Sequence, residues 1–455
     1  MTLDKKTLAT FARENRDSFE ELLKEFVETP TVSAQPDHAP DIARGVDLAT
    51  ATIRAFGGRA EVIATAGYPI VHGLFDAGPG LPTLTVYNHL DVQPASSETE
   101  PWKSEPFVFT KTKDTYWGRG TTDDKGPALA ALFGIKAARE AGVPINLRVL
   151  WEFEEEIGSP NFEKGIVAVK EKVATDSILV SDTIWVSRSR PACPAGLRGM
   201  AGFMLTLETG TTDVHSGVTG GVARNPLGEL MQLVSKMYSA KTGKVKIPGF
   251  YDDVAKLSKA EKQNFIDSGF NAKHFMKATG LKKVRTEDEL EMMMRLWAMP
   301  TMEVHGLVGG YTGTGVKTII PPRAELKISF RLVPDQKPAK IVKMVRDFVA
   351  AQNPDVKVLP ANTMQPYKAP IDSPLAGSVK AAMKFAFGRE PVFVREGGSI
   401  GAVPSMEKVL RCPVMFLGLS LPEHGYHAPN ENFDWGQASG GMAAFAKYFE
   451  LVAKA

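Results

Sequence analysis

The stretch Tyr116-Trp-Gly-Arg-Gly-Thr-Thr-Asp123-Asp124-Lys-Gly126 places two adjacent aspartates between a glycine-rich loop and an apolar segment. Its first two glycines permit backbone turns that a Cβ would forbid. Gly126-Pro127 then opens an alanine-rich run to Ala141, and proline at this position is typical of a helix start. The two like charges repel each other unless a cation lies beside them. Taken alone, the stretch favours an aspartate N-cap over a metal ligand, so the rest of the chain must decide.

Bulk composition excludes several classes of function. A chain of 455 residues is too long for one compact core and predicts two or three domains. The net charge is +2, from 54 basic and 52 acidic residues, which indicates neither a nucleic-acid nor a membrane partner. Cys193 and Cys412 lie far apart, so no disulfide framework is implied. Since no run approaches the roughly 18 apolar residues of a membrane span, we expect a soluble, cytoplasmic protein.

The order of predicted elements indicates an α/β fold. Apolar strands alternate with helices in the first part of the chain, which predicts an open, largely parallel sheet with functional groups at the strand ends. The expected helices are 6–28, 43–56 and 128–141, and the expected strands are 61–64, 70–75, 83–87, 146–153 and 177–180. Pro191 to Pro194 has the composition of a hinge.

The pattern of predicted strands and helices changes after this hinge, and the earlier pattern returns later in the chain. The segment 197–367 has an α+β pattern without acidic strand ends, with strands expected at 202–208, 301–307 and 324–332 and helices at 226–239, 286–297 and 338–352. A helix at 374–387, strands at 391–395 and 413–418 and a helix at 437–453 are expected to complete the first sheet. We therefore predict a discontinuous domain, 1–196 with 368–455, and an inserted domain, 197–367.

Histidines and carboxylates gather at the predicted strand ends of the first domain. They are His89, Asp123, Glu156, Asp182 and His427. Two histidines and three carboxylates suit two divalent ions bridged by one carboxylate. Such a pair activates a shared water and polarises a carbonyl oxygen. Glu155 is the spare carboxylate for a general base, and Asp91 could accept the second N–H of the His89 ring.

Each fragment also has an ordinary structural interpretation. An isolated His-x-Asp is usually a polar pair, three consecutive glutamates are usually a solvated turn, and an aspartate after a strand usually caps a turn. Their joint occurrence at strand ends is what favours a metal site.

These fragments together resemble a known family. His89-Leu-Asp91, Gly118 to Gly126, Glu152 to Ser159, Ser181-Asp182 and His427-Ala-Pro-Asn-Glu431 are similar to the signatures of the dizinc metallopeptidases that include carnosinase, cytosolic nonspecific dipeptidase and glutamate carboxypeptidase. The carnosinase-like branch also shares Asp213 to Gly217, Asn225-Pro226, Ile328 to Pro334 and Arg395 to Ser399.

The resemblance implies a role for each metal-site residue. His89 and Asp182 would bind one zinc, Glu156 and His427 the other, and Asp123 would bridge them. Glu155 would be the general base and then the acid, and Asp91 would orient His89. A cis peptide would join Asp123 to Asp124.

The resemblance also implies roles outside the metal site. The inserted domain would be a lid and dimerisation domain of a homodimer, and His215 would reach the neighbouring subunit's site as an oxyanion donor. Arg331 would pair with the substrate carboxylate, helped by the turn at Gly398 and Ser399. From the residues alone, His215 is a loop histidine and Arg331 is as consistent with a strand-face ion pair.

We therefore expect a dizinc amide hydrolase. It would cleave dipeptides or short peptides with a free C-terminal carboxylate through a metal-bound hydroxide. An N-acyl-amino-acid deacylase or desuccinylase, and a zinc-binding homologue without catalysis, are the alternatives. Manganese or cobalt could replace zinc at such ligands.

Overall fold

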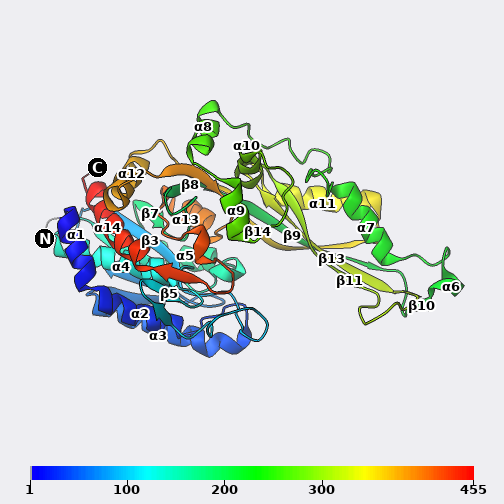
Figure 1. The fold of residues 1–455 in the computed structure, drawn as a ribbon, viewed down its shortest axis with the longest axis horizontal. Helices are drawn as coiled ribbons and strands as arrows, with labels where there is room; N and C mark the ends of the chain where they lie inside the picture. Colours follow the sequence, from blue (N-terminus) through cyan, green and yellow to red (C-terminus); the bar gives the residue numbers. More distant parts are fainter. Residues whose placement is uncertain (1–2, 455) are drawn as a thin grey trace.

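The computed structural model describes residues 3–454, and Figure 1 shows an elongated molecule. Both chain ends lie in a wide α/β body, from which the green and yellow segment extends as a long arm. Among the described residues, no helix is long and apolar enough to cross a membrane.

A six-stranded sheet forms the centre of the body. Its strand order is β1-β2-β6-β3-β7-β17, and β6, β3, β7 and β17 run parallel, whereas β1 and β2 join antiparallel at one edge. The strands are Arg59–Ile63 (β1), Ile70–Phe75 (β2), Thr83–His89 (β3), Asn146–Glu152 (β6), Ser177–Val180 (β7) and Val414–Phe416 (β17). The predicted α/β class with a mostly parallel sheet is confirmed.

Helices cover both faces because strand side chains alternate between them. Val86 and Val149 belong to the large apolar cluster on one face, and Tyr87 and Leu150 to the cluster on the other. The first face carries Lys5–Glu14 (α1), Arg16–Val27 (α2), Ala39–Ala55 (α3), Lys125–Glu140 (α4), Pro374–Phe387 (α12) and Trp435–Val452 (α14); the second carries Phe162–Ala168 (α5) and Ala402–Leu410 (α13).

Three predictions for the body were wrong in detail. The helix expected at 6–28 is two helices, because Asn15 ends α1 by donating its side-chain amide to the carbonyl of Phe11. The expected hinge at Pro191 to Pro194 is mostly strand β8 (Ala192–Leu197). The strand near 391–395, β16 (Val392–Glu396), pairs with β8 in a separate three-stranded sheet with β15 (Tyr367–Lys368), not in the central sheet.

A second sheet forms the arm. Its order is β11-β13-β9-β14, all antiparallel, and its apolar face packs against two helices. The elements are Gly199–Glu208 (β9), Thr301–Gly309 (β11), Arg323–Leu332 (β13), Lys357–Met364 (β14), Pro226–Met237 (α7) and Pro338–Gln352 (α11). These strands all lie within the predicted inserted domain; its limits, 197 and 367, remain predictions.

Three short helices fill the angle between arm and body. They are Lys259–Asp267 (α8), Ala272–Thr279 (α9) and Glu289–Met293 (α10), which continues into Met294–Ala298 (η3). Phe265 and Trp297 form a buried apolar cluster with Ala192 of β8 and Val394 of β16, two strands of the three-stranded sheet in the body. A buried ion pair adds to this contact, since Arg395 Nη2 lies 2.8 Å from Glu261 Oε1. The segment of α8 and α9 therefore lies against the body.

Candidate metal centre

The centre lies where parallel strands end. His89 is the last residue of β3, Asp182 comes two residues after β7, and Glu155 and Glu156 follow β6 in a short 3-10 turn (η2, Glu155–Ile157). The remaining ligand candidates, Asp123 and His427, come from loops that another small sheet brings together, Thr110–Thr112 (β4), Thr115–Trp117 (β5) and Asn432–Asp434 (β18).

Asp123 lies between the other ligand candidates. Its Oδ1 lies 3.0 Å from Nε2 of His89, and its Oδ2 lies 3.0 Å from Nε2 of His427. Each histidine has a second carboxylate close by: Asp182 Oδ2 is 3.8 Å from His89 Nε2, and Glu156 Oε2 is 3.1 Å from His427 Nε2. The two oxygens of Asp123 thus face two separate donor sets, His89 with Asp182 and His427 with Glu156.

The charges of this cluster favour positively charged groups or ions beside the carboxylates. Burial alone would lower the pKa of His427, but hydrogen bonds to Asp123 and Glu156 raise it to about 11. Burial likewise opposes the rise in the pKa of His89, which Asp123 and other carboxylates cause. Burial raises the pKa of Glu156 to about 7 and also that of Asp182. The raised pKa values of both histidines show that these carboxylates favour positive charge beside them.

The donor chemistry fits divalent ions. Asp123 Oδ2 is buried and faces His427 Nε2 at 3.0 Å. Donor atoms of His89, Asp123 and Glu156 lie within 4.8 Å of one another, as do those of His89, Glu155 and Asp182. Imidazole nitrogens with carboxylate oxygens are typical ligands of zinc and related metals.

Asp91 lies differently from the expectation. The ring Nδ1 of His89 is 3.0 Å from the backbone carbonyl oxygen of Asp91 and 3.5 Å from its carboxylate Oδ1. The carboxylate instead accepts the backbone N–H groups of Glu155, at 3.1 Å, and Glu156, at 3.0 Å. It also accepts the hydroxyl of Ser33 at 2.6 Å. Asp91 therefore holds His89 mainly through its backbone and holds the glutamate turn through its side chain.

Glu155 has the environment of a proton acceptor. One of its oxygens lies within 4.8 Å of the donor atoms of His89 and Asp182. Burial is the largest cause that raises the pKa of Glu155 well above its ordinary value, and the charge of Asp182 adds to it. A carboxylate with a raised pKa can take a proton and return it.

Glu431 fixes the loop that carries Asp123. Its buried carboxylate accepts the backbone N–H groups of Gly120, Thr122 and Asp123 at 2.9, 2.9 and 3.1 Å. Arg119 Nη1 donates to the same carboxylate at 2.8 Å. The expected cis peptide between Asp123 and Asp124 is present. The motif containing His427 and the glycine-rich loop are therefore one structural unit.

Sequence reasoning missed two supporting residues. Gln93 donates its side-chain amide to Glu156 Oε2 at 2.8 Å and its backbone N–H to Glu156 Oε1 at 3.1 Å. Tyr426 donates its hydroxyl to Asp182 Oδ1 at 2.6 Å. Tyr426 directly precedes the quoted motif that begins at His427, but only the fold shows that it reaches Asp182.

His424 also supports the metal centre, through hydrogen bonds to the loops around it. Its Nδ1 accepts the backbone N–H of Leu421 at 3.2 Å, so Nε2 is left to donate to Asp434 Oδ2 at 3.1 Å. The hydroxyl of Thr122 lies 3.1 Å from the same Nδ1. Arg188 pairs with Asp434 at 2.9 Å. His424 therefore links the two loops that carry Asp123 and His427.

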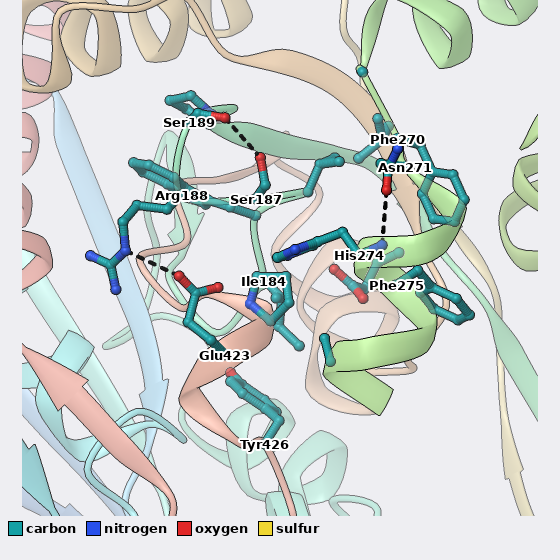
Figure 2. A pocket seen from close by; sticks show the side chains of 18 of the residues that line it. Ile184, Ser187, Arg188, Ser189, Phe270, Asn271, His274, Phe275, Glu423 and Tyr426 are labelled. Carbon is teal, nitrogen blue, oxygen red and sulfur yellow. Dashed lines mark hydrogen bonds and ion pairs between the residues drawn. The ribbon is translucent and has the colours of Figure 1, made fainter. Parts of the chain in front are cut away.

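A cavity of about 1130 Å³ adjoins the centre. Figure 2 shows its walls: the segment after Asp182, from Ile184 to Ser189, the segment that carries Tyr426, and helix α9. Glu396 and Gly397 also line it. At its rim, Arg188 Nε donates to Glu423 Oε1 at 3.0 Å (Figure 2).

The predicted substrate-binding group lies at the junction of arm and body. Arg331, in β13, donates from Nη1 to the hydroxyl of Ser399 at 3.0 Å. The carbonyl of Gly398 accepts the backbone N–H of Arg198. The structure thus brings Arg331 together with the turn at Gly398 and Ser399.

His215 does not lie beside Arg331 and the turn at Gly398 and Ser399. It is exposed on β10 (Val214–His215), which pairs with β12 (Ile319–Ile320) near α6 (Ser216–Thr219). Figure 1 shows these elements at the far end of the arm. His215 cannot serve the metal centre of its own chain in this arrangement.

Comparison with known proteins agrees with this site. Residues 85–451 match the model of peptidase family M20/M25/M40. The chain is 32% identical to the Cys-Gly metallodipeptidase dug1 of Schizosaccharomyces pombe, over all of this chain and 99% of that protein. It is 29% identical to the human Beta-Ala-His dipeptidase, over 97% of this chain and 91% of that protein. The solved structure of the dipeptidase Dug1p of Saccharomyces cerevisiae superposes with a TM-score of 0.89 at 27% identity, over all of both chains.

Fold and site thus define a metal-dependent peptide hydrolase. The chain belongs to peptidase family M20/M25/M40. The family assignment and the two donor sets around Asp123 support a pair of divalent metal ions.

Proposed function

We propose that this peptidase is a dizinc dipeptidase that requires a free C-terminal carboxylate on its substrate. The observation that carries this proposal is the placement of Asp123 between two histidine–carboxylate sets, beside a cavity. The relatives named above are dipeptidases, which supports the same substrate size. His89, Asp182, Asp123, Glu156 and His427 are the proposed zinc ligands.

Bound zinc supplies an activated water and polarises the scissile carbonyl. Glu155 takes the proton of that water and delivers it to the leaving amine as the peptide bond breaks. Asp91 keeps Glu155 in place through the backbone of the glutamate turn. Tyr426 and Gln93 orient Asp182 and Glu156, as second partners of metal ligands commonly do.

Arg331 receives the substrate carboxylate in this proposal. Burial lowers the pKa of Arg331, and no ion pair between it and a carboxylate is found among residues 3–454. A partly buried guanidinium held only by the hydroxyl of Ser399 remains free to bind a planar anion with two hydrogen bonds. The backbone at Gly398 and Ser399 supplies the adjacent wall.

Glu396 is our candidate for the substrate ammonium group. It lines the cavity three residues before Ser399, and among residues 3–454 its carboxylate is held by backbone N–H groups and by no basic side chain. Burial, opposed by the backbone N–H groups of Ile184, Gly397 and Gly398, raises the pKa of Glu396 to about 7. An ammonium ion beside it would favour its charged form. This favours a peptide with a free amine over an N-acyl amino acid.

The arm is proposed to act as a lid and as the dimer contact. Val218, Val222 and Val316 are 80%, 91% and 93% exposed around its tip, which favours their burial by a second copy. Dimerisation there would allow His215 to enter the partner's site as an oxyanion donor. The cytoplasmic location stays a prediction.

Hydrolysis by zinc-loaded protein tests the proposal. Ala-Gly, Ala-Gly amide and N-acetyl-Ala-Gly would be compared, with chelator-treated protein as the control. We expect cleavage of Ala-Gly alone, lost on chelation and restored by zinc. Release of acetate from N-acetyl-Ala-Gly, without cleavage of Ala-Gly, would identify a deacylase, and two bound metals without any cleavage would identify a non-catalytic homologue.

A further inference from the structure

The cavity beside the metal centre is a largely apolar chamber whose lining also includes charged side chains. Phe270 and Phe275 lie on its α9 side, and Trp185 and Trp297 also line it. The charged side chains Arg188 and Glu423 are bonded to each other, and Arg395 is bonded to Glu261. These side chains are therefore already paired, whereas Arg389 and Glu396, which also line the chamber, form no ion pair among residues 3–454. The rest of the lining offers mainly aromatic and aliphatic surface to an occupant.

The chamber lies next to the metal centre, lined by chain neighbours of the ligand candidates and not by the ligand candidates themselves. Ile184 lies two residues after the ligand candidate Asp182, and Ala428 directly follows His427. Tyr426 lines the chamber while its hydroxyl binds Asp182. A substrate whose carbonyl lies at the metals therefore has direct access to this space.

The lining residues indicate which substrate residue points into the chamber. Glu396, our candidate for the ammonium group, lines it, whereas Arg331 and Ser399, our candidates for the carboxylate, do not. The chamber therefore extends from the N-terminal residue of a bound dipeptide. Its volume of about 1130 Å³ reaches the upper end of ligand cavities, roughly 300–1,000 Å³, and leaves room for a large side chain.

We propose that this chamber binds a bulky apolar side chain of the substrate's N-terminal residue and that helix α9 sets the size limit. The inference rests on the proposed dipeptidase function and names its preferred substrate class, dipeptides beginning with an aromatic or long aliphatic residue. Four residues of α9 line the chamber: His274, Phe275, Ala278 and Thr279.

The test compares Phe-Gly with Ala-Gly on zinc-loaded full-length protein, because both share the carboxylate end. Burial of a phenylalanine side chain predicts a kcat/KM about tenfold or more higher for Phe-Gly. Ala278→Trp fills the chamber and Phe275→Ala removes part of its wall. Both variants should lose most of the preference for Phe-Gly, while Ala-Gly hydrolysis stays within about twofold of the parent's.

Lys277→Ala is the matched control, since Lys277 is exposed on the same helix and does not line the chamber. It should keep the full preference. Equal kcat/KM for the two peptides in the parent, or an unchanged preference in Ala278→Trp, would overturn the proposal.

A parent that cleaves neither peptide would instead refute the dipeptidase function. In that case calorimetric binding of Phe-Gly and Ala-Gly to the parent and to Ala278→Trp decides the chamber's role. Tighter binding of Phe-Gly that the variant loses supports it, and equal binding overturns it.

Discussion

Asp91 and Glu155 are joined by a hydrogen bond of 3.1 Å from the backbone N–H of Glu155 to the Asp91 carboxylate. The same carboxylate accepts the N–H of Glu156, so one buried side chain sets the position of both functional glutamates. Asp91 is therefore a positioning residue for the glutamate turn as well as a backbone partner of His89.

Asp91→Asn should lower kcat by about 10–100-fold, because the amide group cannot accept both N–H groups as the carboxylate does. Steady-state kinetics and metal analysis would check this, and Ser33→Ala, which removes only the hydroxyl contact, is the matched control. Full activity in Asp91→Asn would show that the turn holds its position without this carboxylate.

Glu155→Gln should reduce kcat by about 10²–10⁴-fold with both metals still bound, since it removes the proton acceptor and keeps the side-chain shape. Plasma emission spectrometry measures the metal content. Glu154→Gln is the control, because the Glu154 carboxylate binds Tyr68 N–H and Asn161 instead. Comparable turnover in Glu155→Gln and the parent would assign the base elsewhere.

Arg331→Lys should raise KM for Ala-Gly by about 10–100-fold, because a lysine cannot form two parallel hydrogen bonds to a carboxylate. Inhibition by Ala-Gly amide, which lacks this carboxylate, should be unaffected. Arg323→Lys, on the exposed end of the same strand, provides the control. An equal loss for both ligands would point to a general packing defect.

His215→Ala should lower kcat by about 10²–10³-fold, as expected for loss of an oxyanion donor. Mixing this variant with Glu155→Gln tests whether the residue acts across a dimer. One site of each mixed dimer would then combine an intact Glu155 with the partner's intact histidine, and activity should reappear. Mixtures that stay inactive, although mixed dimers form, would exclude the exchange.

Asp434→Asn should destabilise the metal-free protein by about 2 kcal/mol at pH 7. Burial would raise the pKa of Asp434, but His424, the backbone N–H of Gln437 and Arg188 together lower it to about 2. A carboxylate with a depressed folded-state pKa stabilises above its unfolded pKa, near 4, and this stabilisation is lost as the pH falls towards 2.

Urea unfolding at pH 7, 5, 4 and 3 checks this, with exposed Asp47→Asn as the control. The difference between parent and Asp434→Asn should shrink on acidification. A difference that does not depend on pH would assign the effect to packing.

The central fold could be predicted because its signals are local. Apolar strands such as β2 and β7 end where the sequence pattern indicated, and their alternation with helices predicts a parallel sheet. The partner of β16 could not be predicted, since strand pairing depends on contacts between distant segments. Helix α8 was not assigned, because it carries no buried apolar stripe along most of its length.

The metal centre was predictable as a set of residue types, but its supports were not. The fold brings the expected His89, Asp123, Glu156, Asp182 and His427 together. The contacts of Gln93 and Tyr426 span 63 and 244 positions, and no spacing in the sequence indicates them.

The donor set extends from His89 to His427, with the whole arm inserted between its members. During synthesis the amino-terminal half emerges first and can fold early. It then lacks His427, the loop clamp of Glu431 and the outermost parallel strand β17. A growing chain on the ribosome therefore carries an incomplete hydrolytic centre until the arm and the strands beyond it have been translated, which withholds peptidase activity from half-made molecules.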